Sequence, residues 1–328
     1  MSGTLQRTFL TLALAVFTLH GPARADNYPS KSITIMPLLA AGTGLDLTVR
    51  LYAEQLSLAF GKTVVVENKP GSAGLVGIAA LKSAPADGYT MVVATSAVMA
   101  IRPTLLKSVP YDAQKDFIPI ALYVKSPFIL VVNPELPVHS VPQLIKYIKE
   151  RPGKLSYSSS GVGGAPHLST EYMKQRFDID LAHVPYRNSP QSIADVAAGH
   201  VAMAFAEAGA SLPLIRDGRL RALAVTSATR LPTVPELPPF GEAVGAPDFE
   251  AVSWHVLLAP AGTPPEVVGK LNAEMKRIME APDMRKKIAA IGLIPLDVAS
   301  VDATRGYIKA EGEKWGTLVR KLGLEGSQ

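Results

Sequence analysis

Short apolar runs alternate along the chain with longer segments whose apolar residues recur every three to four positions. The first run spans residues 32–36 (SITIM) and is rich in β-branched side chains. In the next segment, 45–60, the residues Val49, Tyr52 and Leu56 fall on one stripe of a helix. The alternation continues with strand-like runs at 64–66, 90–94, 129–132, 155–158, 181–184, 201–205, 220–226 and 254–259 and helix-like segments at 75–83, 141–150, 168–177, 190–198, 264–280, 282–291 and 301–322. This pattern predicts an α/β fold of mostly parallel strands, flanked by helices and joined by right-handed crossovers.

The chain is long enough for two domains, and one segment indicates where it passes between them. At 328 residues it exceeds one ordinary core and fits two units of about 150 residues. Residues 231–239 (LPTVPELPP) carry four prolines in nine positions, so this stretch is irregular or extended and suits a return to the first unit. We expect a discontinuous first lobe of 26–128 plus 251–328, with a second lobe of 129–250 inserted into it. The chain would then pass twice between the lobes, and these two connections would form a hinge. Ligands of such sheets bind at the carboxyl ends of the strands.

The first 25 residues have the pattern of a secretory signal peptide. Arg7 precedes an apolar run at 9–19, and residues 23–25 (ARA) supply the small residues of a cleavage site. The run is too short to cross a membrane, because a hydrocarbon core of about 30 Å needs about 20 helical residues. No later stretch of about 18 residues is both apolar and uncharged. We therefore expect a mature chain that starts at Asp26, acts in a bacterial periplasm and is not embedded in a membrane.

Composition and motifs exclude several classes of function. The chain has no cysteine, which excludes thiol nucleophiles, cysteine-ligated zinc, iron–sulfur clusters and disulfides. Hydrophobic residues make up 48% and charged residues 19%, which excludes a disordered chain, and the net charge of +5 gives no sign of a nucleic-acid partner. The catalytic patterns G-x-S-x-G, S-x-x-K and H-E-x-x-H are absent. We expect no metal, no cofactor and no enzymatic activity.

Loops rich in glycine and serine follow several predicted strands and lead into helices. They span 40–46, 70–74 and 95–96 in the first lobe and 158–164 in the second. Glycines let backbone N–H groups approach a ligand, and a helix N-terminus carries about half a positive charge, so both favour a carboxylate. One such loop is more often an ordinary turn, but four at equivalent strand ends favour one shared cleft. Asp46 fits two roles, as a cap of its helix or as a ligand contact.

The same loops belong to a pattern that covers nearly the whole mature chain. The matching stretches are YPSKSITIM at 28–36, AAGTGLD at 40–46, VVVENKPGSAG at 64–74, ADGYT at 86–90, YDAQKDFIPIAL at 111–122, VVNPELP at 131–137, PGKLSYSSSG at 152–161, HLSTE at 167–171, HVPYR at 183–187, LRALAVT at 220–226, SWHVLLAPAGTP at 253–264 and VGKLNAE at 268–274. In their order and spacing the chain resembles the extracytoplasmic receptors of tripartite tricarboxylate transporters, the Bug family. The resemblance implies a two-lobed periplasmic-binding-protein fold of the Venus flytrap type. It also implies a monomer that captures a small organic anion, such as a di- or tricarboxylate, an amino acid or an aromatic carboxylate, and delivers it to membrane transporter subunits.

The resemblance also identifies candidate ligand-binding residues. The family grips one ligand carboxylate with main-chain amides and ordered waters from loops like 40–46 and 159–167. The candidates carried over on this basis are Gly42, Thr43, Gly44, Ser72, Gly74 and Ser96 in the first lobe and Ser159, Gly161, Gly163 and His167 in the second. The chain departs from the family where an Asp is common, because Ala206 stands there and Glu207 follows it. We add Glu207 as a candidate substitute for that acid; without a substitute, a zwitterionic ligand is not expected.

Three more assignments each leave two roles open. His167 either contacts the ligand or packs and caps the start of its helix. Arg187 either binds a second carboxylate with both arms of its guanidinium or is solvated at the edge of a lobe. Trp254 either closes over an aromatic ligand or fills the core near the return crossing.

Two other functional hypotheses stay open beside the receptor. A secreted hydrolase on the same scaffold would need a Ser-His-acid cluster, with a serine of 158–160 beside His167 or His183. Alternatively, the same receptor passes its signal to a sensor kinase instead of a transporter, and the sequence does not distinguish these two outputs.

Overall fold

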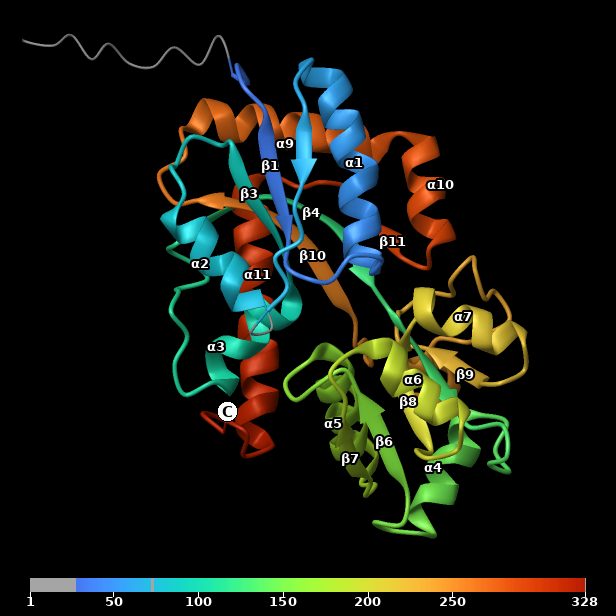
Figure 1. The fold of residues 1–328 in the computed structure, drawn as a ribbon. Coiled ribbons are helices and arrows are strands. Elements are labelled where there is room, and N and C mark those ends of the chain that lie inside the picture. The colour runs from blue at the N-terminus through green and yellow to red at the C-terminus, as the bar shows by residue number, and fades with distance from the viewer. Residues whose placement is uncertain (1–27, 72–73, 328) are drawn as a thin grey trace, which may run out of the picture.

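The computed structural model describes residues 28–71 and 74–327, which form two α/β lobes joined by adjacent strands (Figure 1). The predicted signal peptide at 1–25 and the candidate Ser72 lie outside the described residues. Within the described ranges, no helix combines the length and the apolar character needed to pass through a membrane. In the same ranges, no three side chains of His, Asp or Glu gather as a metal site. The predicted two-lobed α/β fold is confirmed.

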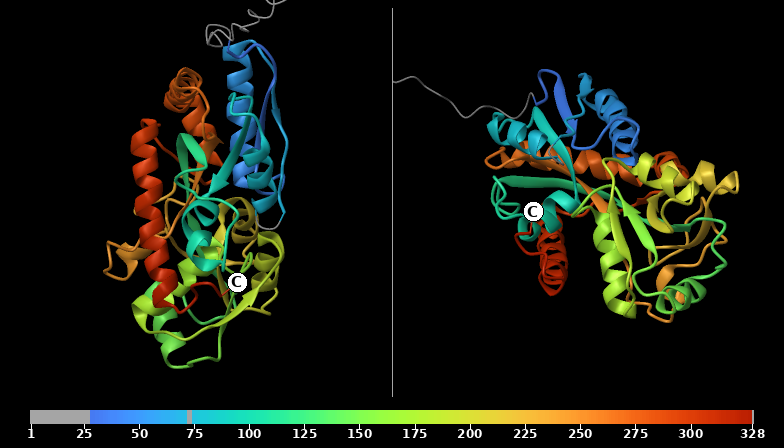
Figure 2. Two further views of the ribbon diagram at one scale, coloured as in Figure 1. Left: turned by 90° about the vertical axis from the view of Figure 1, so that its left-hand side faces the viewer. Right: turned by 60° about the horizontal axis from the view of Figure 1, so that its bottom comes forward.

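The first lobe is built on a six-stranded sheet in the order β11-β4-β10-β3-β1-β2. Its strands are β1 (Ile33–Pro37), β2 (Val64–Val66), β3 (Thr90–Thr95), β4 (Phe117–Ser126), β10 (Ser253–Pro260) and β11 (Ile294–Pro295). Its helices are α1 (Gly44–Phe60), α2 (Leu75–Ser83), the π-helix η3 (Ala97–Ile101), α3 (Arg102–Leu105), α9 (Pro265–Glu280), α10 (Pro282–Ala290) and α11 (Val301–Lys321). Helices α1, α9 and α10 cover one face, where Val49, Tyr52 and Leu56 of the predicted stripe are fully buried. Helices α2 and α11 cover the other face (Figure 1, Figure 2).

The second lobe is built on a five-stranded sheet in the order β7-β6-β8-β5-β9. Its strands are β5 (Phe128–Val132), β6 (Ser156–Ser159), β7 (Ala182–Pro185), β8 (Met203–Glu207) and β9 (Arg221–Val225). Its helices are α4 (Val141–Lys149), α5 (Ala165–Phe177), α6 (Ser189–Ala197), α7 (Ala208–Arg216) and α8 (Phe240–Ala243). Helices α4, α5 and α8 pack on one face and α6 and α7 on the other. The proline-rich stretch 231–239 forms only isolated bridges, as its composition predicts.

Both sheets are mixed, whereas the sequence pattern predicted mostly parallel ones. Strand β1 pairs in parallel with β2 and β3, and β6 pairs in parallel with β7 and β8. The strands that carry the chain between the lobes pair antiparallel: β10 with β3 and β4, and β5 with β8 and β9. Ser126 at the end of β4 lies opposite Ser253 at the start of β10. Because the chain leaves and re-enters the first lobe at this one place, the two neighbouring strands have to run in opposite directions.

The apolar pattern does not predict β4, β11, η3, α3, α7 and α8, and the longest of these are β4 and α7. Strand β4 contains Pro119, which lies where the register with β10 shifts between Leu257 and Leu258. Prolines are tolerated in sheets at such irregularities. Helix α7 contains Gly209 and Pro213, both of which weaken a helix interior. Both elements form because tertiary packing overrides local propensity, with β4 held between β10 and β11.

The two chain crossings lie side by side and form one narrow joint. Thr226 N–H donates to the Phe128 carbonyl at 2.9 Å, and Ala251 N–H donates to the Thr226 carbonyl at 3.2 Å. The Thr226 hydroxyl also accepts from the Phe128 N–H at 2.8 Å. Beside these bonds, Lys125 and Glu250 form an ion pair at 2.9 Å. The crossings therefore have a fixed geometry about which the lobes are connected.

Trp254 belongs to the core and not to a ligand site. It is fully buried, and its indole N–H donates to the Glu311 carboxylate of α11 at 3.0 Å. The indole N–H of Trp315 donates to the same oxygen at 3.0 Å. Of the two roles open to Trp254, the structure therefore favours the core.

Candidate ligand-binding cleft between the lobes

Asp46 holds the loop that leads into α1. Asp46 is buried, and its carboxylate accepts from the Gly42 N–H at 2.9 Å and pairs with Arg50 at 3.0 Å. It also accepts from the Asn68 side-chain amide at 3.0 Å. Burial opposes ionisation, but these hydrogen bonds outweigh it and keep the pKa of Asp46 below its ordinary value. The Thr43 hydroxyl caps the helix by accepting from the Asp46 N–H at 3.4 Å. The loop itself therefore occupies the Asp46 carboxylate, and a ligand contact by Asp46 stays a prediction.

Two backbone N–H groups are left over at the start of α1. Those of Gly44 and Leu45 have no acceptor among the described residues. The helix of 17 residues adds its partial positive charge at the same end. Gly44 also lies beside the α10–β11 turn, since a Cβ there would be 3.5 Å from Leu293. The start of α1 can therefore receive an anion close to this turn.

Gly74 and Ser96, the other described candidates of the first lobe, lie in tighter surroundings. Gly74 has φ of 97°, and a Cβ there would be 3.2 Å from Val98 and 3.4 Å from Leu38. Ser96 is fully buried after β3, and its hydroxyl lies 2.9 Å from that of Ser253. Ser96 thus ties a strand end of the first lobe to the returning strand. Whether either residue contacts a ligand stays a prediction.

Two stacked histidines hold the loop after β6 in the second lobe. The Gly163 N–H donates to Nδ1 of His167 at 3.1 Å. The Ser159 hydroxyl lies 2.7 Å from Nε2 of His183 and also accepts from the Gly161 N–H at 3.2 Å. The two imidazole rings stack with centroids 4.3 Å apart. These hydrogen bonds join four predicted residues of this lobe, Ser159, Gly161, Gly163 and His167, and fix the loop.

The packing keeps both imidazoles neutral. Burial lowers the pKa of His167, and burial with the neighbouring His167 lowers that of His183 to about 4. Tyr157 also stacks on His183, with centroids 4.8 Å apart, and its hydroxyl donates to Glu171. Because Nδ1 of His167 accepts a hydrogen bond from the Gly163 N–H, a proton on that nitrogen would break this hydrogen bond. The His167 side chain thus packs and positions the loop, which is the second of its two predicted roles.

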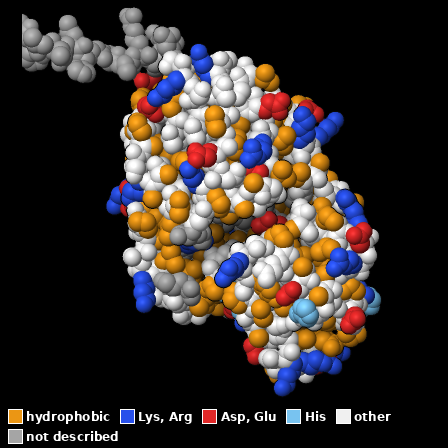
Figure 3. Space-filling model, in the orientation of Figure 1, with side chains coloured by type: hydrophobic (Ala, Val, Ile, Leu, Met, Phe, Trp, Pro, Cys, Tyr) orange, Lys and Arg blue, Asp and Glu red, His pale blue; other side chains and the backbone are white. Residues whose placement is uncertain are grey.

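Two contacts between the lobes bring the loops together. A Cβ at Gly163 would lie 1.9 Å from Cδ2 of Leu105 in α3, so a larger residue at this position would force the Leu105 side chain to move. A Cβ at Gly292 would lie 2.3 Å from Cβ of Ala208 at the start of α7. The residue after Gly292 is the one that packs on Gly44, so the starts of α1 and α7 both border the same turn. Figure 3 shows the surface hollowed between the lobes, with acidic side-chain atoms inside the hollow.

The other two charged candidates, Arg187 and Glu207, lie in different surroundings, and neither side chain has a hydrogen-bond or ion-pair partner among the described residues. Arg187 is exposed just after β7. Glu207 is the last residue of β8 and the N-cap of α7, next to the Ala208 contact with the first lobe. Burial raises the pKa of Glu207 above its ordinary value. Glu207 therefore lies at the lobe interface, while Arg187 lies on the surface.

The contact between Ser159 and His183 does not make a catalytic triad. A triad needs an acid that hydrogen-bonds the histidine, and no described carboxylate does so. Glu171 is occupied by Tyr157 and by a lysine of its own helix. Ser159 is buried, and its hydroxyl also donates to the loop backbone at 3.1 Å. The arrangement braces a loop and offers no exposed nucleophile.

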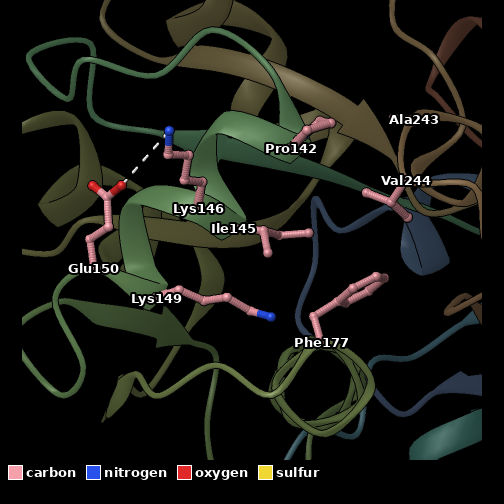
Figure 4. Close-up of a pocket in the computed structure, with 8 residues that line it drawn as sticks. All are labelled: Pro142, Ile145, Lys146, Lys149, Glu150, Phe177, Ala243 and Val244. Atoms are coloured by element: carbon pink, nitrogen blue, oxygen red, sulfur yellow. Dashed lines mark ion pairs between the residues drawn. The ribbon is translucent and has the colours of Figure 1, made fainter.

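Two cavities lie away from the hollow between the lobes. One of about 520 Å³ lies against α4, α5 and α8 (Figure 4) and is lined by Pro142, Ile145, Lys146, Lys149, Glu150, Phe177, Ala243 and Val244. The other, of about 420 Å³, lies between η3 and α11. Neither contains a predicted site residue, so neither replaces the interlobe hollow as the candidate site.

Sequence reasoning missed several residues that shape this site. Leu105, Ala208 and Gly292 make the contacts between the lobes, and no local pattern marks them because their partners are distant in the chain. His183 carried a signal, as the first residue of the stretch HVPYR, but that stretch gave no indication of a stack with His167.

Comparison with known proteins agrees with this architecture. A family model described as "Tripartite tricarboxylate transporter family receptor" matches residues 48–324. A UPF0065 protein from the tcbD–tcbE intergenic region of Pseudomonas sp. strain P51 is 35% identical, covering 98% of this chain and 96% of the relative. BugT of Bordetella pertussis is 33% identical, covering 95% of each chain. The solved structure of R. palustris Rpa4515 with adipate is 33% identical with a TM-score of 0.83, covering 90% of this chain and 98% of that one. The chain therefore belongs to the tripartite tricarboxylate transporter receptors of the Bug family, which are substrate-binding proteins and not enzymes.

Proposed function

We propose that this chain is an extracytoplasmic receptor that captures a small organic carboxylate between its lobes and delivers it to a tripartite tricarboxylate-type transporter. The observation that carries the proposal is a pair of helix starts, one in each lobe, with unoccupied donors. The N–H groups of Gly44 and Leu45 at α1, and of Ala165 and His167 at α5, have no acceptor among the described residues. Helix starts of this kind bind anions.

The loops beside these donors supply the rest of the proposed site. In the first lobe we propose contacts from Thr43 and Gly44, with Ser72, Gly74 and Ser96 as further candidates. In the second lobe we propose contacts from Ser159, Gly161 and Gly163. His167 contributes through its main-chain N–H, since its ring is engaged by Gly163. Arg187 is exposed just after β7, and we propose that it meets a ligand only when the lobes close over one.

We propose that the lobes divide as 26–128 plus 251–328 and 129–250, and that they rotate about the paired crossings. A ligand that bridges both lobes binds the closed arrangement more tightly than the open one, and this difference drives closure. The Lys125–Glu250 pair and the Thr226 hydrogen bonds lie at the joint and are expected to persist in both states.

Carboxylates are the first ligands to test. Rpa4515, whose structure holds adipate, shares 33% identity with this chain over 90% of its length. We further propose that residues 1–25 are removed on export and that the mature chain acts as a monomer in the periplasm. Its partners would be the two membrane subunits of the transporter, and passing the signal to a sensor kinase is the competing output.

Isothermal titration of ligand-free protein against straight-chain mono- and dicarboxylates, with the corresponding amides as controls, tests the binding step. We expect saturable binding of at least one carboxylate and none of its amide, because the helix donors need a negative charge. If no carboxylate binds and the purified protein cleaves esters or amides, the proposal is wrong. Uptake of the bound ligand by proteoliposomes holding the membrane subunits tests delivery, and uptake that does not depend on the receptor contradicts it.

A further inference from the structure

Glu207 occupies a special position between the lobes. It ends β8, and its Cα lies opposite that of Phe128, the first residue of the crossing strand β5. Ala208, the next residue, packs against Gly292 of the first lobe, and the turn that holds Gly292 also packs on Gly44 at the start of α1. Glu207 is thus connected through one turn to the helix start that we propose for anion binding.

The Glu207 carboxyl group has no partner in the described protein. It forms no hydrogen bond or ion pair with any residue of 28–71 or 74–327, although the Glu207 main-chain carbonyl accepts from the Ser211 hydroxyl at 2.9 Å. It also makes no capping hydrogen bond to the N–H groups of α7. The residue keeps some exposed surface, so a ligand can reach it. A half-buried carboxylate without donors is unfavourable and takes up a proton more readily than usual.

No charged neighbour offsets this effect. The α10–β11 turn at 290–296 and strand β5 contain no ionisable residue. Lys125 of β4 is paired with Glu250, and His167 and His183 of α5 and β7 are held neutral. Accordingly, burial is the single cause that raises the pKa of the carboxyl group.

The remaining charged groups of the surrounding elements are occupied or exposed. Asp46 of α1 is bound to Arg50, and Asp195 of α6 accepts a hydrogen bond from Tyr186 at 2.6 Å. Arg187 between β7 and α6 is exposed. The described residues thus offer the Glu207 carboxylate no positive partner. Its charge is therefore either neutralised by a proton or compensated by the ligand.

We propose that Glu207 binds the ligand in its protonated form and donates its hydrogen to the second carboxylate of a dicarboxylate, whose first carboxylate lies at the helix starts. This inference rests on the proposed function and names the ligand class. Before binding, the ionised fraction of Glu207 takes one proton from solvent; in the complex the acid O–H donates to a ligand oxygen, and no covalent bond forms or breaks. Anion-binding helix starts on both sides favour this reading over a ligand ammonium group, which would instead need the ionised carboxylate.

The test uses the tightest-binding member of the straight-chain dicarboxylates from succinate to suberate. Calorimetry from pH 6 to pH 9, in buffers of different ionisation enthalpy, counts the protons taken up; we expect the number per dicarboxylate to rise towards one as the pH passes above the raised pKa of Glu207. Above the raised pKa, the Kd should rise about tenfold per pH unit. Glu207→Gln keeps an N–H donor, so it should bind within a few-fold of the wild type at pH 7.5, with no proton uptake and no pH dependence. Glu207→Ala should bind at least tenfold more weakly.

The matched control is Glu236→Gln, which removes an exposed acid of the same lobe and should leave the proton uptake unchanged. Dicarboxylate binding with no proton uptake anywhere between pH 6 and pH 9 and with an affinity that does not fall as pH rises, or proton uptake retained in Glu207→Gln, overturns the inference and leaves the receptor function intact. An amino acid that binds more tightly as pH rises, through Glu207, also overturns it. If no carboxylate binds at any pH, the proposed function fails instead. Thermal melting of each variant shows that it is folded.

Discussion

The loop at 40–46 and the loop at 158–164 both lead from a strand into a helix and both are rich in glycine, yet different side chains hold them. In the first lobe one ionised carboxylate, Asp46, gathers Gly42, Arg50 and Asn68 around itself. In the second lobe two neutral, stacked imidazoles accept or share the hydrogen bonds of the loop. Loops of the same sequence type can therefore depend on charge in one lobe and on the absence of charge in the other.

This difference has a consequence for binding. The Asp46 carboxylate accepts the hydrogen bond of the Gly42 N–H, while the N–H groups of Gly44 and Leu45 have no acceptor among the described residues. The His167 ring accepts the hydrogen bond of the Gly163 N–H, while the main-chain N–H of His167 has no acceptor among the described residues. Asp46 and His167 thus each fix a loop through a glycine that precedes the helix, Gly42 or Gly163, and the N–H groups at the helix start remain for an anion.

The largest expected effect on stability comes from removing the Asp46 carboxylate. Asp46→Ala removes the ion pair with Arg50 and the acceptor of the Gly42 and Asn68 N–H groups, and should lower the free energy of unfolding by about 3 kcal/mol. Ser159→Ala in the other lobe removes neutral hydrogen bonds and should cost about 1 kcal/mol. Urea unfolding measured by circular dichroism gives both values. Equal losses would show that the two loops do not differ in the way described.

Acid should affect the two loops at different pH. His183 has a folded-state pKa of about 4, so the unfolded chain, with an ordinary pKa near 6.5, takes up a proton first. The stability that neutral His183 provides is complete above about pH 6.5 and is lost as pH falls towards 4, by up to about 1.4 kcal/mol per pH unit. The pKa of Asp46 is lowered, so its contribution persists through this window and is lost only below the ordinary pKa of about 3.9.

The measurement is the difference in unfolding free energy between pH 7.5 and pH 4.5, in the wild type and in His183→Gln. We expect the difference to shrink by about 2 kcal/mol in the variant. His255, buried in the first lobe with a pKa of about 3, also loses stability in this range, so the wild-type slope alone is not diagnostic. An unchanged difference in His183→Gln would contradict the role given to the stacked rings.

Local patterns predicted the elements of this fold well but not their directions or distant contacts. The periodicity of 45–60 gives α1 to within one residue, and 64–66 and 75–83 coincide with β2 and α2, because apolar spacing reports which side of a segment is buried. The antiparallel course of β4 and β10 depends on where the chain crosses between lobes, which periodicity does not record.

The same limit applies to the site. Glycine and serine spacing indicated both loops, because turn chemistry is local. The stacked rings of His167 and His183 come from α5 and β7, and the close approach of Gly163 to Leu105 joins two lobes. Such contacts exist only once the sheets are assembled.

Two glycines that look alike in sequence should have the same small effect on stability and differ in their effect on ligand binding. Gly42 and Gly163 both have positive φ, 81° and 71°, so alanine at either position should cost about 1 kcal/mol in backbone strain. A Cβ at Gly42 meets nothing within 4 Å, whereas one at Gly163 would lie 1.9 Å from Leu105. Gly163→Ala should therefore also hold the lobes apart and weaken carboxylate binding about tenfold, while Gly42→Ala should leave affinity within about twofold. Adding Leu105→Ala to Gly163→Ala makes room for the new methyl group and should restore most of the affinity in calorimetry. If the double variant binds no better than Gly163→Ala, strain within the loop and not the approach of the lobes explains the loss.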